Sequence, residues 1–356
     1  MNKSKIKAEA QQLYLGLTKR KTIFIIFLSL LIVVITIIAA NLGAASLGIK
    51  EVISAIFSKI FPAYSRPEES AFTIIWELRL PRIFMSIVVG MGLAVAGTVM
   101  QGVLKNPLAS PYTLGIASAA GFGAALAIIS GIGFFGTSYL WIATNAFLFA
   151  LLSSFLVLGL AKLKKASPET LILAGVAMMF LFSAMVSFLQ YTGTTENVTA
   201  VVFWLMGDLS KASWLKVGVV ALIVSGTFPL LMRYAWDFNA LTFGDETAKS
   251  LGIDVEKVRL VGLVLSSLLT AGTICFVGTI GFIGLASPHI SRMIIGGDHR
   301  FLLPTSCLMG AVLLLAADTA ARTIFSPLIL PIGILTSFLG VPLFVWLIIK
   351  RRKEYW

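Results

Sequence analysis

The sequence predicts an all-α membrane protein, a polytopic bundle of about ten transmembrane helices with both termini in the cytoplasm. Three observations lead to this fold class. The 356 residues are 58% hydrophobic and only 12% charged, whereas a soluble domain carries about 25% charged residues. Apolar stretches of about 20 residues, the length needed to span a bilayer, recur along the chain. Basic residues gather in every second connection between these stretches.

The apolar stretches give ten expected spans, of which the eighth is short and contains Pro288. Basic residues precede the first stretch, as they do in a secretory signal. Its apolar core is longer than a signal core, however, and further spans follow, so we expect a membrane anchor. The expected spans lie near 22–43, 83–104, 114–134, 138–161, 170–190, 213–232, 258–278, 282–296, 302–321 and 331–349.

The distribution of basic residues predicts the orientation. With the N-terminus inside, 20 of the 28 lysines and arginines fall on the cytoplasmic side, as the positive-inside rule requires. We expect a basic cytoplasmic segment at 1–21, one membrane domain at 22–349 with a large inner loop at 233–259, and a basic cytoplasmic tail at 350–356. The stretch WELRLPR (76–82) falls outside in this topology, so its two arginines run against the trend.

Composition and motifs also exclude several classes of protein. In a membrane protein, a net charge of +12 indicates basic loops that face anionic lipid, and we expect no nucleic-acid partner. Cys275 and Cys307 lie in apolar runs and are expected to be packing residues. With only His289 and His299 besides, no metal cluster and no cofactor are expected. The sequence contains no G-x-x-x-x-G-K-[ST] motif and no catalytic constellation, so we expect no enzymatic activity and any ATP must bind to another chain.

Intramembrane charge is scarce. Asp318 is the clearest case, and Arg322 follows four residues later on the same helical face, where the two can pair. A carrier driven by an ion gradient would be expected to bury several ionisable groups near the bilayer centre. An ion-coupled secondary transporter therefore remains the alternative of another class, and it is disfavoured.

The inner loop reads LTFGDETAKSLGIDVEKVRL at its centre. We expect Asp245 to cap a short helix that runs to Ser250 and ends near Gly252, and Asp254 to cap the next helix. The resulting projection would show an apolar side at Ala248 and Leu251 and a polar side at Glu246 and Lys249. This favours a docking element over an ordinary solvated loop.

Several motifs together give a specific resemblance. They are ELRLPR (77–82), QGVLKNPLASPYTLG (101–115), FGDETAKSLG (243–252), GFIGLASPHISR (281–292), DHRFLLP (298–304), ADTAAR (317–322) and LPIGILTSFLGVPLFVWLI (330–348). In their order and spacing, from about residue 70 to 349, the chain resembles the permease subunits of binding-protein-dependent ABC importers for iron chelates, haem and cobalamin.

The resemblance implies the partners. They are a second permease subunit, identical or related, two ATP-binding subunits, and an extracytoplasmic substrate-binding protein, assembled in a bacterial cell (inner) membrane. It also implies that the loop docks the ATP-binding subunits through Gly244, Asp245, Glu246, Ala248, Leu251 and Gly252. Arginines matching Arg79, Arg82 and Arg322 would meet carboxylates of the binding protein. Without the resemblance, Arg79 and Arg82 could equally anchor at lipid headgroups, with Pro81 in the first turn of the second span.

The remaining site residues also come from the resemblance. Ser167, Pro168 and Glu169 match an inner gate. Cobalamin importers tend to carry small hydroxyl residues there, so Pro168 and Glu169 favour an iron chelate, with haem or cobalamin as alternatives. The pathway is expected along the fifth span, at Met178, Met179, Ser183 and Ser187, although such a stripe could equally be packing.

Overall fold

The described part of the chain, in a computed structural model, comprises residues 3–43, 47–60, 68–131, 139–162, 167–326 and 328–350, and all its regular elements are helices. They are α1 (Lys3–Asn41), α2 (Ile49–Ile60), α3 (Glu69–Thr73), the π-helix η1 (Ile74–Arg79), α4 (Leu80–Val103), α5 (Ile116–Ser130), α6 (Tyr139–Lys162), α7 (Pro168–Thr192), α8 (Thr195–Leu205), α9 (Trp214–Arg233), α10 (Ala235–Thr242), α11 (Asp245–Ser250), α12 (Val255–Val277), α13 (Ile283–Ile295), α14 (His299–Thr323) and α15 (Ile332–Lys350).

Each of the ten expected spans overlaps one of these helices, so the all-helical membrane fold is confirmed. Seven helical stretches among the described residues are long and apolar enough to cross a bilayer. The other three expected spans coincide with α5, α13 and α15. The apolar stretches in α5 and α15 are shorter, and α13 has only 13 residues. The count of ten spans therefore stays a prediction.

The expected division of the chain at its two ends stays a prediction. α1 begins at Lys3 and continues without a break to Asn41, so no change of structure marks the expected boundary after residue 21. Of the expected tail, residues 351–356 lie outside the described residues.

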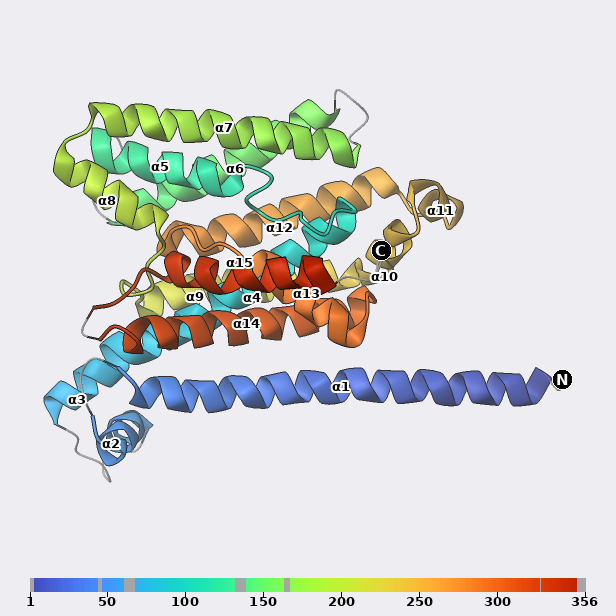
Figure 1. Cartoon of the computed structure of the whole chain (residues 1–356), viewed down its shortest axis with the longest axis horizontal. Coiled ribbons are helices and arrows are strands. Elements are labelled where there is room, and N and C mark those ends of the chain that lie inside the picture. The colour runs from blue at the N-terminus through green and yellow to red at the C-terminus, as the bar shows by residue number, and fades with distance from the viewer. Residues whose placement is uncertain are drawn as a thin grey trace.

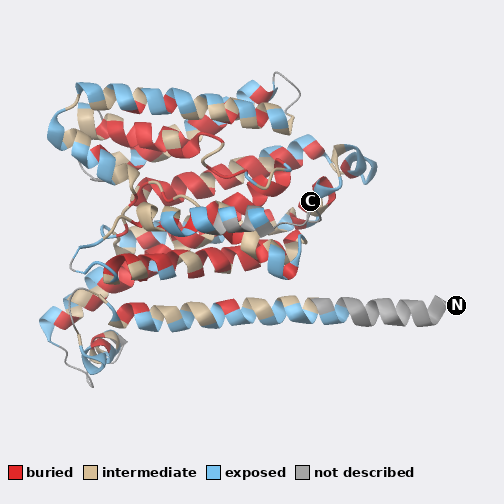
Figure 2. Cartoon of the chain, in the orientation of Figure 1, coloured by how far each residue is buried: buried red, intermediate tan, exposed pale blue. Residues whose placement is uncertain are grey.

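The long helices lie side by side, with α4 inside the bundle (Figure 1). α4 packs against α14, α12, α13 and α9, while α5, α6 and α7 form a layer farther from it. Figure 2 shows buried residues concentrated on α4, α5, α12 and α14, whereas α1 and α7 are exposed along their outer faces. One end of the bundle carries α10, α11 and the N-terminal end of α1, and is called the α11 end below. The opposite end carries α2, α3 and α8, and is called the arginine end (Figure 1).

Glycines bring α4 into backbone contact with two neighbouring helices. A Cβ atom on Gly90 would overlap the carbonyl group of Gly310 in α14, and one on Gly97 would overlap the carbonyl group of Gly284 in α13. Small residues allow membrane helices to approach this closely. These glycines are therefore packing residues.

The second span begins earlier than expected. We placed its start near residue 83, with Pro81 in the first turn, but α3, η1 and α4 form one continuous helical stretch from Glu69 to Val103. Pro81 has no N–H group and so cannot complete the hydrogen-bond ladder of the preceding turn. The π-helical segment lies directly before it, over Ile74–Arg79. Arg79 is the last residue of this segment and is buried.

Candidate functional site

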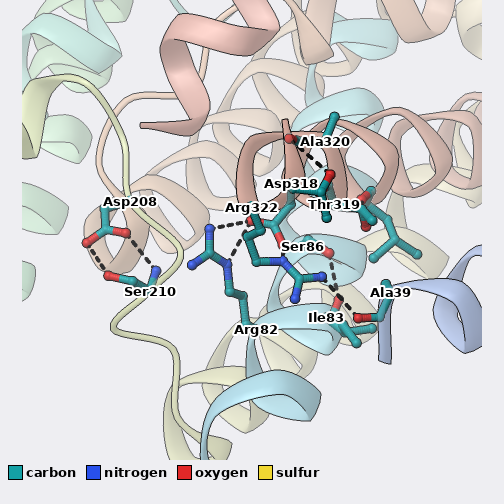
Figure 3. A network of polar contacts seen from close by, with 12 residues as sticks. Ala39, Arg82, Ile83, Ser86, Asp208, Ser210, Asp318, Thr319, Ala320 and Arg322 are labelled. Carbon is teal, nitrogen blue, oxygen red and sulfur yellow. Dashed lines mark hydrogen bonds and ion pairs between the residues drawn. The ribbon is translucent and has the colours of Figure 1, made fainter. Parts of the chain in front are cut away.

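At the arginine end, two guanidinium groups share one carboxylate (Figure 3). Nε and Nη2 of Arg82 each lie 2.8 Å from Oδ1 of Asp318, and Nε of Arg322 lies 3.2 Å from Oδ2. The Asp318 side chain is fully buried. The expected pairing of Asp318 with Arg322 is confirmed. The contact with Arg82 was not predicted, because Arg82 and Asp318 lie 236 residues apart in the sequence.

The same end anchors the C-terminus of α1. Nη1 of Arg79 donates hydrogen bonds to the carbonyl oxygens of Ala40, at 2.7 Å, and Asn41, at 3.1 Å. Arg322 donates to those of Ala39 and Leu42, both at 3.3 Å. The last carbonyls of a helix lack partners within the helix and carry partial negative charge. The two arginines therefore cap α1.

The structure thus brings Arg79, Arg82 and Arg322 together at one end of the bundle. In this conformation, however, they are only 5–6% exposed. They make internal contacts with Asp318 and with α1. Three guanidinium groups lie near one carboxylate, so the cluster itself carries excess positive charge.

At the α11 end, Asp245 connects three elements. Its Oδ1 atom lies 2.6 Å from Nζ of Lys105, which follows α4, and both carboxylate oxygens lie 3.0 Å from Nη2 of Arg259 in α12. Burial alone would raise the pKa of Asp245, but the hydrogen bonds from Lys105 and Arg259 hold it below its usual value. The carboxylate therefore stays ionised and ties α11 to α4 and α12.

The expected helix from Asp245 to Ser250 is confirmed, but two details of it were wrong. The N-cap residue is Gly244, with φ of 109°, and the Asp245 carboxylate makes no cap hydrogen bond because it is used in the ion pairs. Ala248 was expected on the surface and is fully buried. The expected cap of α12 is confirmed, since Asp254 accepts a hydrogen bond from Lys257 N at 3.0 Å.

The projection that α10 and α11 form carries exposed apolar side chains. Phe243, which precedes α11, is 76% exposed, and Leu251, which directly follows it, is 66% exposed. Glu246 is also exposed and pairs with Lys249 at 3.5 Å. Gly252, at φ of 81°, turns the chain where a Cβ would meet nothing. Large apolar side chains on a projecting element suit a protein partner.

A second polar network fastens α10 to the start of α14. Asp298 accepts a hydrogen bond from Asn239 Nδ2 at 2.8 Å and pairs with Arg300 at 2.6 Å. The Arg300 guanidinium stacks on the exposed Trp236 ring, 4.0 Å from its centre. Burial of Asp298 opposes ionisation, but the hydrogen bonds from Arg300 and Asn239 outweigh it and lower its pKa to about 2. Sequence reasoning missed this network, although DHRF had been noted as part of the resemblance.

The expected gate residues form the beginning of α7. Ser167 is the N-cap and accepts a hydrogen bond from Thr170 N at 3.3 Å, while Pro168 and Glu169 occupy the first turn. Each residue suits its position. The Ser167 hydroxyl supplies the acceptor that an N-cap needs, and the missing N–H of Pro168 costs nothing in the first turn. The acidic side chain of Glu169 lies near the positive end of the helix dipole.

The four expected pathway residues fall into two pairs. Met178 and Met179 are half-buried beside Gly115, whereas Ser183 and Ser187 are exposed on α7. None of the four lines the cavity of about 880 Å³ in the described part of the bundle. That cavity lies between the segment 110–112, the segment 279–282, α13 and α15, and its few polar side chains include Tyr112, Thr279 and Ser337.

Fold and site together define a polytopic helical membrane protein with a projecting element at one end and a buried arginine cluster at the other. A model of the FecCD transport family matches residues 30–350. The chain belongs to the FecCD transport family and is an ABC importer permease of that family.

Relatives and solved structures agree with this membership. The chain is 46% identical to a protein of Methanocaldococcus jannaschii assigned as an ABC transporter permease, over 96% of this chain and 99% of the relative. It is 38% identical to the hemin transport permease HmuU of Yersinia pestis, over 92% and 96%. A solved inward-facing structure, assigned to the metal-chelate type of ABC transporter, superposes with a TM-score of 0.80 at 34% identity, over 92% of this chain and 99% of the other. Further relatives are named for molybdate, cobalamin and iron(III) citrate import.

Proposed function

We propose that this permease carries an iron chelate of the siderophore type into the cell, across the cell (inner) membrane of a bacterium. Two copies, or this chain and a related permease, enclose the pathway. Two separate ATP-binding subunits drive it from the cytoplasm, and an extracytoplasmic binding protein delivers the chelate. Both termini are cytoplasmic, and no reaction is catalysed by this chain. Haem and cobalamin are the alternative cargoes.

The single observation that supports this function best is the projection at the α11 end. Phe243 and Leu251 are exposed there, while Asp245 secures α11 to Lys105 and Arg259. A partner that pulls or pushes on α11 would thereby act directly on α4 and α12. This is the arrangement required of an element that transmits ATP-driven closure, and we assign residues 244–252 to that role.

The arginine end is our candidate for binding-protein docking. Charge pairs at an interface favour orientation and fast association more than raw affinity. Because Arg79, Arg82 and Arg322 are buried in this conformation, direct contact would require the end of α1 to move aside. We propose that a binding protein rich in carboxylates promotes that movement.

The inner gate and the pathway complete the proposal. Ser167, Pro168 and Glu169 sit at the end of α7 nearer α11, and Ser183 and Ser187 lie exposed farther along the same helix. In a two-permease assembly this exposed side of α7 would face the second subunit. Pro168 and Glu169 favour an iron chelate over cobalamin, as argued from the resemblance.

Reconstitution tests the function. Vesicles that contain the permease and its ATP-binding subunit should accumulate a ⁵⁵Fe-chelate when ATP is enclosed in the vesicles and the binding protein is added outside. They should not accumulate it when ATP is depleted. Uptake that survives ATP depletion and collapses with the ion gradient would instead identify a secondary transporter. Uptake of hemin or cobalamin in preference to the iron chelate would correct the cargo and leave the class unchanged.

A further inference from the structure

The short helix α2 has two apolar faces, of which one is buried inside the protein and the other is exposed. Val52 and Ala55 are 1% and 0% exposed and pack with Ile75 and the end of α1. We propose that the other face is a lipid-contact surface. In this arrangement α2 lies in the membrane–water interface at the arginine end, with Ile49, Ile53 and Phe57 inserted among the phospholipids.

The exposed face follows a helical pattern. Ile49, Ile53 and Phe57 are spaced four residues apart, so they form one stripe along the helix. They are 67%, 50% and 49% exposed. Such a stripe on a helix of 12 residues is unfavourable in water, because the free energy falls when the apolar surface of each side chain leaves water. With these 12 residues, α2 is also too short to span a bilayer, which needs about 20.

The position of α2 suits an interfacial helix. It lies beyond the end of α1 and crosswise to it, whereas the spans run parallel to α1 (Figure 1). A helix crosswise to the spans lies along the plane of the membrane. Interfacial helices of this type bury one apolar face by about 5–10 Å at the boundary between headgroups and acyl chains.

Tryptophans place α2 at the level of the headgroups. Trp76 donates a hydrogen bond from Nε1 to the carbonyl oxygen of Ala55 in α2, at 2.7 Å. Trp214 donates to the carbonyl oxygen of Trp76 at 2.8 Å, and the two ring centres are 5.8 Å apart. Tryptophan is enriched at membrane–water interfaces. The helix is thus bound directly to an aromatic cluster that marks this interface.

Two further observations favour lipid over a soluble protein as the occupant. The exposed apolar side of α1, including Leu30 and Ile37, continues to Leu42, shortly before α2 begins, so a lipid-facing surface leads up to it. Lys50 and Lys59 flank the stripe, and Lys59 lies over the Trp76 ring, 4.5 Å from its centre. Lysines at an interface extend to lipid phosphates while their stems cover apolar surface.

Site-directed spin labelling tests this inference. Single cysteines replace Ile53 or Phe57 in full-length protein whose buried Cys275 and Cys307 have been changed to alanine. The labelled protein is placed in vesicles of phosphatidylethanolamine and phosphatidylglycerol. Collisions of each label with oxygen, which concentrates in lipid, are compared with collisions with a water-soluble nickel chelate. Leu30→Cys on the outer side of α1 is the lipid control, and Glu196→Cys, exposed at the arginine end, is the water control.

Labels at positions 53 and 57 should collide with oxygen more than with nickel, as the label at position 30 does, but they should lie at a shallower depth of about 5–10 Å below the phosphates. Nickel collisions equal to those at position 196 would overturn the proposal, because α2 would then lie in water. Low collisions with both reagents would overturn it as well, since they would show that protein, such as a second copy of this chain, covers the stripe. The result does not depend on the cargo or on ATP.

Discussion

Arg82 and Asp318 are 236 residues apart in the sequence, and two nitrogens of the Arg82 guanidinium lie 2.8 Å from the same carboxylate oxygen. This contact ties the start of α4 to the end of α14. Arg322 approaches the other oxygen. Asp318 is therefore the one negative charge that compensates two buried cations among the described residues of this cluster.

Replacing Asp318 by asparagine should lower the free energy of unfolding by about 3–5 kcal/mol, because removing one partner leaves buried charge uncompensated. Thermal unfolding in detergent measures the effect. Asp208→Asn is the matched control, since the Asp208 carboxylate lies at the same end and accepts hydrogen bonds from N and Oγ of Ser210. Equal melting temperatures of Asp318→Asn and the wild type would mean that the cluster contributes no net stability.

A second prediction concerns Asp245. Asp245→Asn should weaken both ion pairs that hold α11 and reduce the coupling of ATP hydrolysis to uptake. The loss of stability should stay near 1 kcal/mol, because these partly exposed pairs are screened by solvent. The ratio of chelate transported to ATP hydrolysed, measured beside the melting temperature, separates the two effects. Glu256→Gln is the control, since this exposed residue in the first turn of α12 lies outside residues 244–252 and should change neither quantity. Normal coupling in Asp245→Asn would refute the assigned role of the α11 projection.

The docking proposal can be separated from folding. Arg79→Gln should weaken binding-protein association at low salt more than Lys211→Gln, which removes an exposed cation from the same end. Because Arg79 also caps α1, each variant needs its melting temperature measured alongside. An Arg79 variant that loses stability but docks normally would assign this arginine to α1 alone.

Acid should selectively weaken the link between α10 and α14. The pKa of Asp298 is lowered from 3.8 to about 2 in the folded protein. A lowered pKa stabilises the fold above the unfolded value, and this contribution is lost as pH falls from 3.8 towards 2. The stability difference between wild type and Asp298→Asn should therefore be constant near neutral pH and shrink over that interval. A difference that is independent of pH down to 2 would show that the Asp298 carboxylate is not the titrating group.

Sequence alone predicted what depends on neighbours along the chain. Apolar length located the helices, a spacing of four joined Asp318 to Arg322, and Asp254 capped α12 as expected. It failed where partners come from distant segments. Arg82 could not be assigned to Asp318 without knowing that α4 and α14 are adjacent. Asp245 has the character of a cap residue, but Lys105 and Arg259 compete for its carboxylate, and Gly244 takes the cap position instead.

The cavity and the arginine cluster show the same limit. Polar residues of the cavity wall, such as Tyr112 and Ser337, come from segments more than 200 residues apart, so no local pattern marks them. Arg79 is buried at the end of the π-helical segment, where it donates a hydrogen bond to a carbonyl of α1. A topology rule could place this arginine at the end of a span, but it could not show that the side chain turns inward.

The closest contact of α4 with α13 gives the last prediction. Gly97→Ala would place a methyl group onto the backbone of Gly284, and backbone atoms cannot shift as a flexible side chain can. We expect strong destabilisation, or failure to accumulate in the membrane. Gly218→Ala in α9 is the control, because a Cβ there meets nothing within 4 Å. In a helix this change should instead stabilise by about 0.5–1 kcal/mol, through the lower backbone entropy of alanine. Melting temperatures in detergent and yields from membranes distinguish the two. If Gly97→Ala behaves like Gly218→Ala, α4 and α13 are not held in backbone contact, and the rigid attachment between these helices is disproved.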